Sequence, residues 1–203
     1  MTIYTNYTEI PKAAYNLVYL DPPWPYTSFG TAKLQYRTMT WEAIKCLPIQ
    51  DIMAKECVLF MWITSPLAAQ QYRVIIHWID THKLTFQGEP FVWVKTRKDG
   101  NPLGATGPRP RLTKPLSERL VCLSNTGNKR PFPLANDATC QTVFETEDVW
   151  TQREGHSVKP AIFREKIVNL FKDSDQLKKI ELFSRREVPG WDHFGDEVVC
   201  SPT

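Results

Sequence analysis

The chain has 203 residues, of which 42% are hydrophobic and 23% charged, an ordinary composition for one globular domain with its own core. We therefore expect a single domain over residues 1–203. The net charge of +3 is too small to indicate a nucleic-acid partner by itself. No apolar run approaches 18 residues and residues 1–11 are polar, so neither a membrane span nor a signal peptide is predicted.

Five short runs rich in β-branched and aromatic residues are predicted to be buried strands: Leu17–Leu20, Val58–Ile63, Phe91–Val94, Leu120–Leu123 and Lys179–Phe183. Helices are expected between several of them. One opens after Thr40 as its cap, and one from Leu67 to Lys83 is introduced by Ser65 as cap with Pro66 behind it. A third starts near Ser157 and runs to about Lys172.

This alternation of strands and helices predicts an α/β fold with a mostly parallel sheet and helices on both faces. Ligands in such sheets bind beyond the carboxyl ends of the strands, where Trp24, Thr64, Thr96 and Ser184 would lie. No predicted strand is followed by G-x-G-x-x-G, so a nucleotide-like cofactor would be held mainly by side chains.

The cysteines are five in number, and no two are close in sequence: Cys46, Cys57, Cys122, Cys140 and Cys200. An odd number without close pairs argues against a disulfide framework and against a zinc site. We expect no bound metal and a cytoplasmic location.

A carboxylate, a rigid diproline and an aromatic ring follow the first predicted strand as Asp21-Pro22-Pro23-Trp24. This order suits a planar amino group such as the exocyclic amine of adenine, whose two N–H groups need acceptors. Asp21 supplies one acceptor and the Pro22 carbonyl a second. Trp24 offers a face for base stacking, worth about 1–3 kcal/mol. The alternative is a strand that simply ends in a polyproline turn.

The segment from residue 95 to residue 119 is strongly basic. Seven basic residues (Lys95, Arg97, Lys98, Arg109, Arg111, Lys114 and Arg119) stand against Asp99 and Glu118, a balance of +5. A loop of this charge could follow a phosphate backbone. A solvated surface loop is the alternative.

Two later segments could hold a cofactor through side chains. His156-Ser157-Val158-Lys159-Pro160 stands at a predicted helix start, where the N–H groups and Lys159 favour a carboxylate; plain capping by Ser157 is the alternative. Near the carboxyl terminus, Asp196-Glu197 follows a glycine, and two carboxylates suit the hydroxyls of a ribose. An acidic tail is the alternative there.

The motifs D-P-P-W, H-S-x-K-P and E-L-F-x-R-R followed by P-G-W-x-x-x-G-[ND]-E occur in this order along the chain. Together they resemble the S-adenosylmethionine-dependent adenine N6-methyltransferases named after the seventy-kilodalton methyltransferase-A subunit of the mRNA enzyme. The segments F-M-W-I-T (60–64) and F-V-W-V-K-T (91–96) match two further family motifs. The resemblance spans roughly residues 16–198, and the small size resembles the bacterial and phage branch.

The resemblance implies a Rossmann-like methyltransferase fold with permuted motif order, S-adenosyl-L-methionine as cofactor and direct methyl transfer to an adenine amine. The implied catalytic residues are Asp21, Pro22, Pro23 and Trp24. The implied cofactor-binding residues are Asp21, Lys159, Arg185, Asp196 and Glu197. The implied substrate-binding residues are Tyr26, Tyr36, Trp62, Lys95, Arg109, Arg111, Lys114 and Glu118.

Two positions depart from the family pattern. Residue 196 is Asp where Asn is common, and Gly107 to Arg111 does not follow the usual sequence of the substrate loop. The implied partner is nucleic acid, with DNA favoured over RNA, acted on by a monomer or homodimer without membrane contact. An RNA methyltransferase, a non-catalytic nucleic-acid-binding subunit and a protein-amide methyltransferase are the alternatives; the last usually carries Asn in the tetrapeptide.

Overall fold

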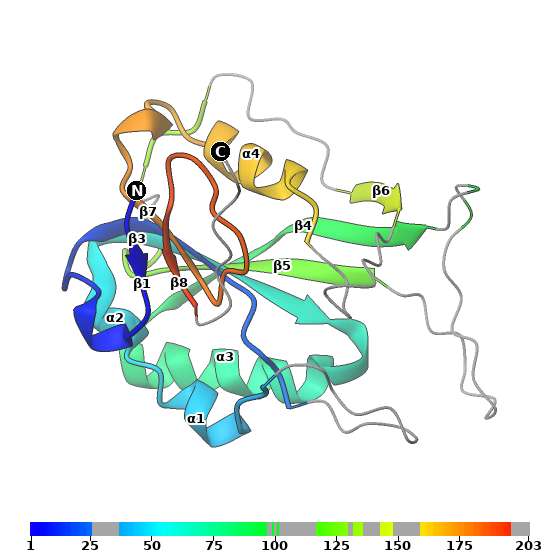
Figure 1. Cartoon of the computed structure of the whole chain (residues 1–203), viewed down its shortest axis with the longest axis horizontal. Helices are drawn as coiled ribbons and strands as arrows, with labels where there is room; N and C mark the ends of the chain where they lie inside the picture. The colour runs from blue at the N-terminus through cyan, green and yellow to red at the C-terminus, as the bar shows by residue number, and fades with distance from the viewer. Residues whose placement is uncertain are drawn as a thin grey trace.

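The computed structural model describes residues 1–25, 37–96, 99, 101, 117–129, 132–135, 143–147 and 159–195. Within these ranges eight strands form one sheet in the order β1-β8-β7-β2-β3-β5-β4-β6 (Figure 1). The strands are β1 (Ile3–Tyr4), β2 (Tyr15–Leu20), β3 (Met53–Thr64), β4 (Thr85–Thr96), β5 (Ser117–Ser124), β6 (Val143–Glu147), β7 (Lys179–Leu182) and β8 (Asp192–Phe194).

Four α-helices accompany the sheet: α1 (Trp41–Lys45), α2 (Ile49–Ile52), α3 (Ala68–His82) and α4 (Ile162–Asn169). Short 3-10 turns occupy Tyr7–Glu9, Ser65–Leu67 and Ser174–Gln176. None of the helices in the described ranges is both long and apolar enough to span a membrane.

All neighbouring strands run parallel except for the two pairs that β5 makes with β3 and β4. The predicted mostly parallel α/β sheet is therefore confirmed. Because β5 is reversed, its amino end lies at the same sheet edge as the carboxyl ends of the other strands. Thr64, the last residue of β3, pairs with Glu118, the second residue of β5.

Strand β2 is central and buried on both faces. Its residues alternate between two cores: Val18 and Leu20 belong to one, Leu17 and Tyr19 to the other. An alternating pattern of this kind follows from the period-two geometry of a strand. Fully burying one such apolar side chain contributes about 1.5–3 kcal/mol.

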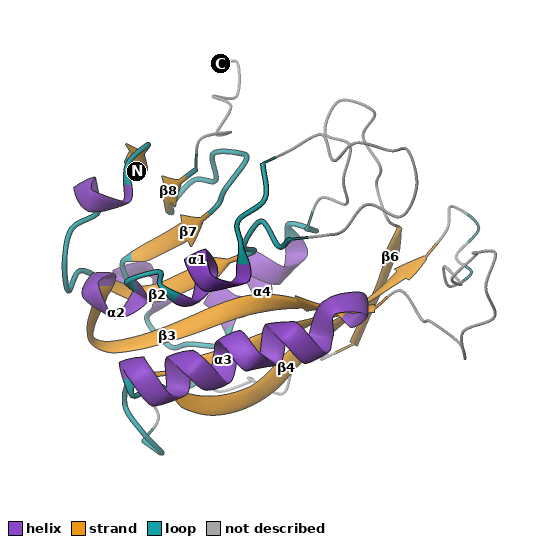
Figure 2. Cartoon of the chain, turned by 90° about the horizontal axis from the view of Figure 1, so that it is seen from below, coloured by secondary structure: helices purple, strands orange, loops and turns teal. Residues whose placement is uncertain are grey.

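Helices cover the two faces unequally. Helices α1 and α3 lie along one face, while α4 lies across the other (Figures 1 and 2). Ile44, Val74 and Trp78 fill the first core, and Phe163 and Ile167 the second.

The two connections that flank β2 therefore cross opposite faces of the sheet. The chain leaves β2 through α1 and α2 on one face toward β3, whereas it enters β7, on the other side of β2, through α4 on the opposite face. The carboxyl end of β2 is the topological switch point of this sheet, the usual ligand position in open α/β folds.

The predicted elements agree with these strands, with differences at their ends. All five predicted strands are present, although Phe183 lies outside β7 because its φ of 60° is incompatible with an extended strand. Thr40 caps α1, accepting a hydrogen bond from the Ala43 amide at 3.1 Å, as predicted. The start predicted near Ser157 for the third helix lies outside the described residues, which contain α4 from Ile162.

The predicted cap at Ser65 is wrong. Ser65 begins a 3-10 turn, and α3 starts at Ala68 without a side-chain cap. The Ser65 hydroxyl instead donates to the Ser117 carbonyl at 2.7 Å, because β5 lies beside the end of β3. A local sequence signal for capping was overridden by this tertiary contact.

Gly195 directly follows β8 and lies against the end of β7. A Cβ atom at this position would lie 2.4 Å from the Ser184 carbonyl oxygen. We therefore expect Gly195→Ala to lower the free energy of unfolding by about 1–3 kcal/mol through overpacking, measured by urea denaturation.

Gly190→Ala is the matched control for that variant. Gly190 has a φ of 81° but no atom within 4 Å of an added Cβ, so only backbone strain of about 1–2 kcal/mol is expected there. The destabilisation of each variant is measured as the shift of its urea unfolding midpoint, not as a loss of activity. A Gly195→Ala variant with an unchanged midpoint would contradict the close contact with Ser184.

Candidate functional site

The carboxyl end of β2 continues into a rigid turn that carries Asp21. The Trp24 amide donates to the Pro22 carbonyl at 2.8 Å, and the Met39 amide donates to the Pro23 carbonyl at 2.8 Å. Two consecutive prolines fix φ at both central positions and hold the turn in one conformation. The Asp21 carboxylate, 32% exposed, is thereby presented at the switch point of the sheet.

Lys159 links Asp21 to a second carboxylate. Its Nζ lies 2.9 Å from Asp21 Oδ2 and 2.7 Å from Glu118 Oε2, and Lys95 Nζ lies 2.6 Å from Glu118 Oε1. The four charges alternate and cancel. They come from the turn after β2, the end of β4, the start of β5 and the segment before α4, so only the folded chain brings them together.

The Glu118 carboxylate is buried and is compensated by two ammonium groups. Its Oε2, which is closed to solvent, lies 2.7 Å from Lys159 Nζ, and its Oε1 lies 2.6 Å from Lys95 Nζ. Both oxygens therefore have a charged partner inside the protein.

Both lysines lie over tryptophan rings. Lys159 Nζ is 5.3 Å from the centroid of Trp62, and Lys95 Nζ is 4.6 Å from that of Trp93. The two rings meet edge to face at 6.2 Å. Cation–π attraction at a buried ring can reach about 2 kcal/mol, so the rings help to fix both ammonium groups.

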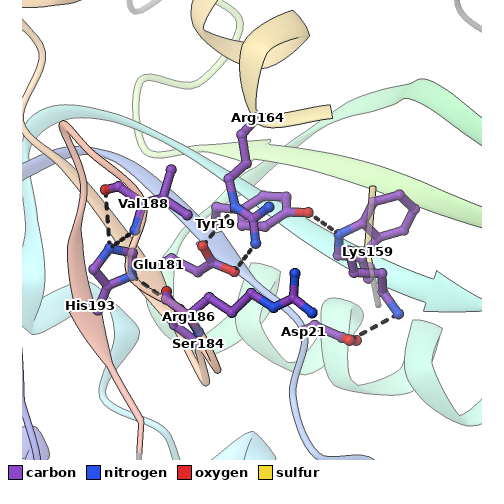
Figure 3. Close-up of polar contacts among 10 residues, drawn as sticks. Tyr19, Asp21, Lys159, Arg164, Glu181, Ser184, Arg186, Val188 and His193 are labelled. Atoms are coloured by element: carbon purple, nitrogen blue, oxygen red, sulfur yellow. Dashed lines mark hydrogen bonds and ion pairs between the residues drawn. The ribbon is translucent and has the colours of Figure 1, made fainter. Parts of the chain in front are cut away.

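A further ion pair supports these rings from β7. Arg164 in α4 forms a bidentate pair with Glu181, and its guanidinium lies 5.2 Å from the centre of the Tyr19 ring (Figure 3). Tyr19 in turn accepts a hydrogen bond from Trp62 Nε1 at 2.5 Å. These side chains therefore form a continuous series of contacts from Glu181 to Lys159.

The charges of the cluster are maintained by their mutual contact. Burial by itself would raise the pKa of Glu118, but Lys159 and Lys95 outweigh it and hold that pKa below its usual value. Burial would lower the pKa of Lys159, yet the carboxylates of Asp21 and Glu118 raise it well above its usual value. Both groups are therefore charged at neutral pH.

The structure brings together four of the residues selected from the sequence: Asp21, Lys159, Glu118 and Lys95. Arg185 follows β7 at the same edge and is half-buried. Seven further predicted residues lie outside the described part of the chain: Tyr26, Tyr36, Arg109, Arg111, Lys114, Asp196 and Glu197.

Three placements differ from the sequence-based expectation. Lys95 was expected to face the substrate, but it is only 8% exposed and is paired with Glu118. Trp24 was expected to stack on a base and Trp62 to bind substrate; both side chains are buried. Trp24 packs against Trp41, with centroids 5.6 Å apart, because the Pro22–Trp24 turn directs its ring into the first core. Trp62 lies in the second core, where its ring supports Lys159 instead.

Several supporting residues were missed by the sequence analysis. Trp93 and Glu181 stand inside the motifs F-V-W-V-K-T and E-L-F-x-R-R but were given no role, and Arg164 stands in no motif. A further signal was the period of two, which places Trp93 and Lys95 on the same face of one strand. Among the described residues no group of three or more His, Cys, Asp or Glu side chains could hold a metal ion.

Comparison with known proteins connects this arrangement to one family. The sequence model of the family described as MT-A70 matches residues 15–197. The chain is also similar to the type II methyltransferase M.MunI of Mycoplasma sp, with 27% identity over 213 residues that cover 95% of this chain and 81% of that protein.

Two further relatives are longer proteins. The N6-methyladenosine RNA methyltransferase MTA1 of Cryphonectria parasitica is 25% identical over 192 residues, covering 91% of this chain and 52% of that protein. The N(6)-adenine-specific methyltransferase METTL4 of Mus musculus is 27% identical over 193 residues, covering 91% of this chain and 38% of that protein. The chain thus spans most of the first relative and about half or less of these two.

The ion-pair cluster makes stability depend on pH through Glu118. A carboxyl whose pKa is lower in the folded than in the unfolded protein stabilises the fold above the unfolded pKa. That contribution is lost as the pH falls through the folded pKa. Glu118→Gln should therefore be less stable than wild type at pH 7, and the difference should shrink below about pH 4.3. Below that pH, the free energy of unfolding of the wild type should fall more steeply with decreasing pH than that of Glu118→Gln, by up to about 1.4 kcal/mol per pH unit. Denaturant unfolding from pH 7 to pH 3 measures both curves.

The exposed residue Glu42, paired with Lys45 within α1, supplies the control. Glu42→Gln should change stability by less than about 0.5 kcal/mol at any of these pH values, because surface ion pairs contribute little. Wild-type and Glu118→Gln curves that stay parallel through the acidic range would rule out the charged, buried state of Glu118.

Proposed function

The chain belongs to the MT-A70 family, and we propose that it is an S-adenosylmethionine-dependent methyltransferase acting on the N6 amine of adenine in DNA. The observation that carries this proposal is the position of Asp21. Its carboxylate stands at the switch point of the sheet on a rigid diproline turn, beside a proline carbonyl and in contact with Lys159. We infer that residues 1–203 form one methyltransferase domain, working as a monomer or homodimer.

Asp21 and the Pro22 carbonyl form a pair of acceptors suited to an aromatic amine. Lys159 contacts Asp21 through Oδ2, and no ion pair among the described residues engages Oδ1, so we infer that Oδ1 can accept from a donor. The Pro22 carbonyl accepts one hydrogen bond from the Trp24 amide and keeps a second lone pair. The two N–H groups of an adenine amine therefore find two acceptors fixed on one turn, which orients the nitrogen and the plane of the base.

The same carboxylate serves the chemistry of the reaction. The adenine amine is a weak nucleophile because its lone pair is delocalised, and positive charge develops on the nitrogen as it is alkylated. A fixed carboxylate beside that nitrogen stabilises the charge as it appears. Asp21 then accepts the departing N–H proton or passes it to water.

The residues around Asp21 also fit the proposed cofactor. S-adenosylmethionine supplies a methyl group on a sulfonium, an electrophile strong enough that no covalent enzyme intermediate is needed. Lys159 has three N–H donors, and its two carboxylate partners leave one for an incoming carboxylate. Arg185, Asp196 and Glu197 are the proposed partners of the ribose.

DNA is the proposed polymer because the chain covers 81% of a type II methyltransferase but only 52% of the RNA methyltransferase MTA1. Arg109, Arg111 and Lys114 are the proposed phosphate contacts. RNA is the second candidate, since its adenine presents the same amine. A non-catalytic subunit is disfavoured by the intact D-P-P-W turn and its contact with Lys159. A target base in duplex DNA would have to be flipped out of the helix.

The decisive experiment supplies the protein with methyl-labelled cofactor and matched DNA and RNA oligomers, single- and double-stranded, followed by digestion and identification of the labelled nucleoside. N6-methyladenine from DNA supports the proposal, and the same base from RNA alone supports the second candidate. Oligomers whose adenines are replaced by purine, which lacks the amine, serve as the control. Label in another base, or none, would refute the proposed activity.

Replacing Asp21 should affect methyl transfer and cofactor binding differently. Asp21→Ala should reduce the rate of methyl transfer by at least about 100-fold, because charge developing on the nitrogen loses its fixed partner. The dissociation constant for the cofactor should change by less than about threefold, because Lys159 keeps Glu118 as partner. Rates are measured at saturating cofactor, and affinity by calorimetric titration. A loss of affinity as large as the loss of rate would contradict the role assigned to Asp21.

Lys159 is expected to behave in the opposite way. Lys159→Ala should weaken binding of S-adenosylmethionine and of its demethylated product roughly ten- to hundredfold, because a hydrogen bond to a charged group is worth about 1.5–3 kcal/mol. Lys95→Met is the matched control: it removes the other ammonium from Glu118 but leaves the proposed carboxylate contact intact. Equal affinities for wild type and Lys159→Ala would place the cofactor carboxylate elsewhere.

A further inference from the structure

His193 is a buried residue whose two ring nitrogens are both engaged. It lies in β8, between Ile3 of β1 and Glu181 of β7 in register, and none of its surface is exposed. Its Nδ1 is 3.0 Å from the Ser184 hydroxyl, and its Nε2 accepts a hydrogen bond from the Val188 amide at 2.9 Å. Figure 3 shows the ring facing the segment from Ser184 to Val188, which follows β7.

Both ring nitrogens of His193 contact the 184–188 segment. Nε2 accepts from the Val188 amide and also lies 3.2 Å from the Val188 carbonyl oxygen. Nδ1 lies beside the Ser184 hydroxyl, which donates to the Arg186 carbonyl at 2.7 Å. The imidazole thus joins the two ends of the 184–188 segment.

A second, independent contact holds the same segment to β8. The Ser184 amide donates to the Phe194 carbonyl at 3.0 Å, and Gly195 approaches Ser184 so closely that no side chain fits between them. The backbone on either side of Arg185 is therefore fixed: Ser184 by β8, and Arg186 by the Ser184 hydroxyl. Residue 196 follows directly after this contact in the sequence.

We propose that His193 is a positioning residue that holds the 184–188 segment so that Arg185 reaches the ribose of the bound cofactor. This proposal rests on the proposed function. His193 acts through Ser184 and Val188 and does not itself touch the cofactor. The β8 strand would thereby position, through one ring, the segment carrying Arg185.

The first readout is made without cofactor. Hydrogen exchange at the Val188 amide should be slow in wild type and faster by about tenfold or more in His193→Ala, because its acceptor is lost. His193→Gln should keep Val188 protected, since a Gln Oε1 can occupy the place of Nε2. His193→Asn should not, because an Asn amide can replace only the Nδ1 contact with Ser184.

The second readout is calorimetric affinity for S-adenosylmethionine together with steady-state kinetics. His193→Ala should raise the dissociation constant and the cofactor KM by about tenfold, the equivalent of one neutral hydrogen-bonded contact, while kcat at saturating cofactor stays within about twofold. His193→Gln and His193→Asn should each recover part of the affinity.

The control is Asp192→Asn, at the neighbouring buried position of the same strand. Asp192 faces away from the 184–188 segment, toward the Tyr15 hydroxyl and the Thr2 amide. This variant should lose stability in thermal melts yet bind cofactor as wild type does. All affinities are compared at a temperature where every variant is folded.

The outcomes separate the two proposals. A wild-type protein that binds no S-adenosylmethionine overturns the proposed function, and the role of His193 with it. If the wild type binds the cofactor and methylates adenine, and His193→Ala binds the cofactor with the same dissociation constant, only the role of His193 is overturned. Equal weakening in Asp192→Asn and His193→Ala also overturns it, because the effect would then belong to the stability of β8 as a whole.

Discussion

The buried ammonium of Lys159 is the group on which the arrangement of this site depends. Removing an ion from water costs several kcal/mol, so a lysine at this depth is tolerated only among carboxylates. Asp21 and Glu118 meet that requirement, at 2.9 and 2.7 Å. The chain before α4, the turn after β2 and the start of β5 are thereby held in one place by a single nitrogen.

Glu118 can take part because β5 runs against the other strands. In an all-parallel sheet the second residue of a strand would lie at the amino edge, far from Asp21. The reversal of β5 between β3 and β4 brings that residue to the carboxyl edge, opposite Thr64 and Trp93. Strand direction therefore decides that a second carboxylate reaches the switch point, and that Lys95 can neutralise it.

Aromatic residues pack beneath the charged cluster and support it. Trp62, Trp93 and Tyr19 are buried in the second core, where their faces and edges support Lys159, Lys95 and Arg164. Trp24 packs on Trp41 in the first core and stiffens the turn behind Asp21. Rigid aromatic packing beneath a charged cluster limits the rotamers of its long side chains and keeps the carboxylate of Asp21 in place.

The pattern of residues was sufficient to predict the α/β class, the five principal strands and the edge of the sheet at which Asp21 lies. These features follow from short-range causes: apolar periodicity, proline geometry and the carboxyl-end position of ligands in parallel sheets. The helix-start pattern selected Lys159 and the family resemblance added Glu118, although nothing in their spacing brings the two within 3 Å of each other.

The amino-acid sequence by itself determined that a carboxylate on a diproline turn would end a central buried strand, since both strand burial and proline φ are local properties. Tertiary structure decided the rest of the site. Whether Lys95 meets solvent or Glu118, which ammonium Trp62 supports, and whether Ser65 caps a helix or bonds to Ser117 all depend on which strands become neighbours. The physical reason is that burial and charge pairing are set by residues distant in sequence, and no local pattern records them.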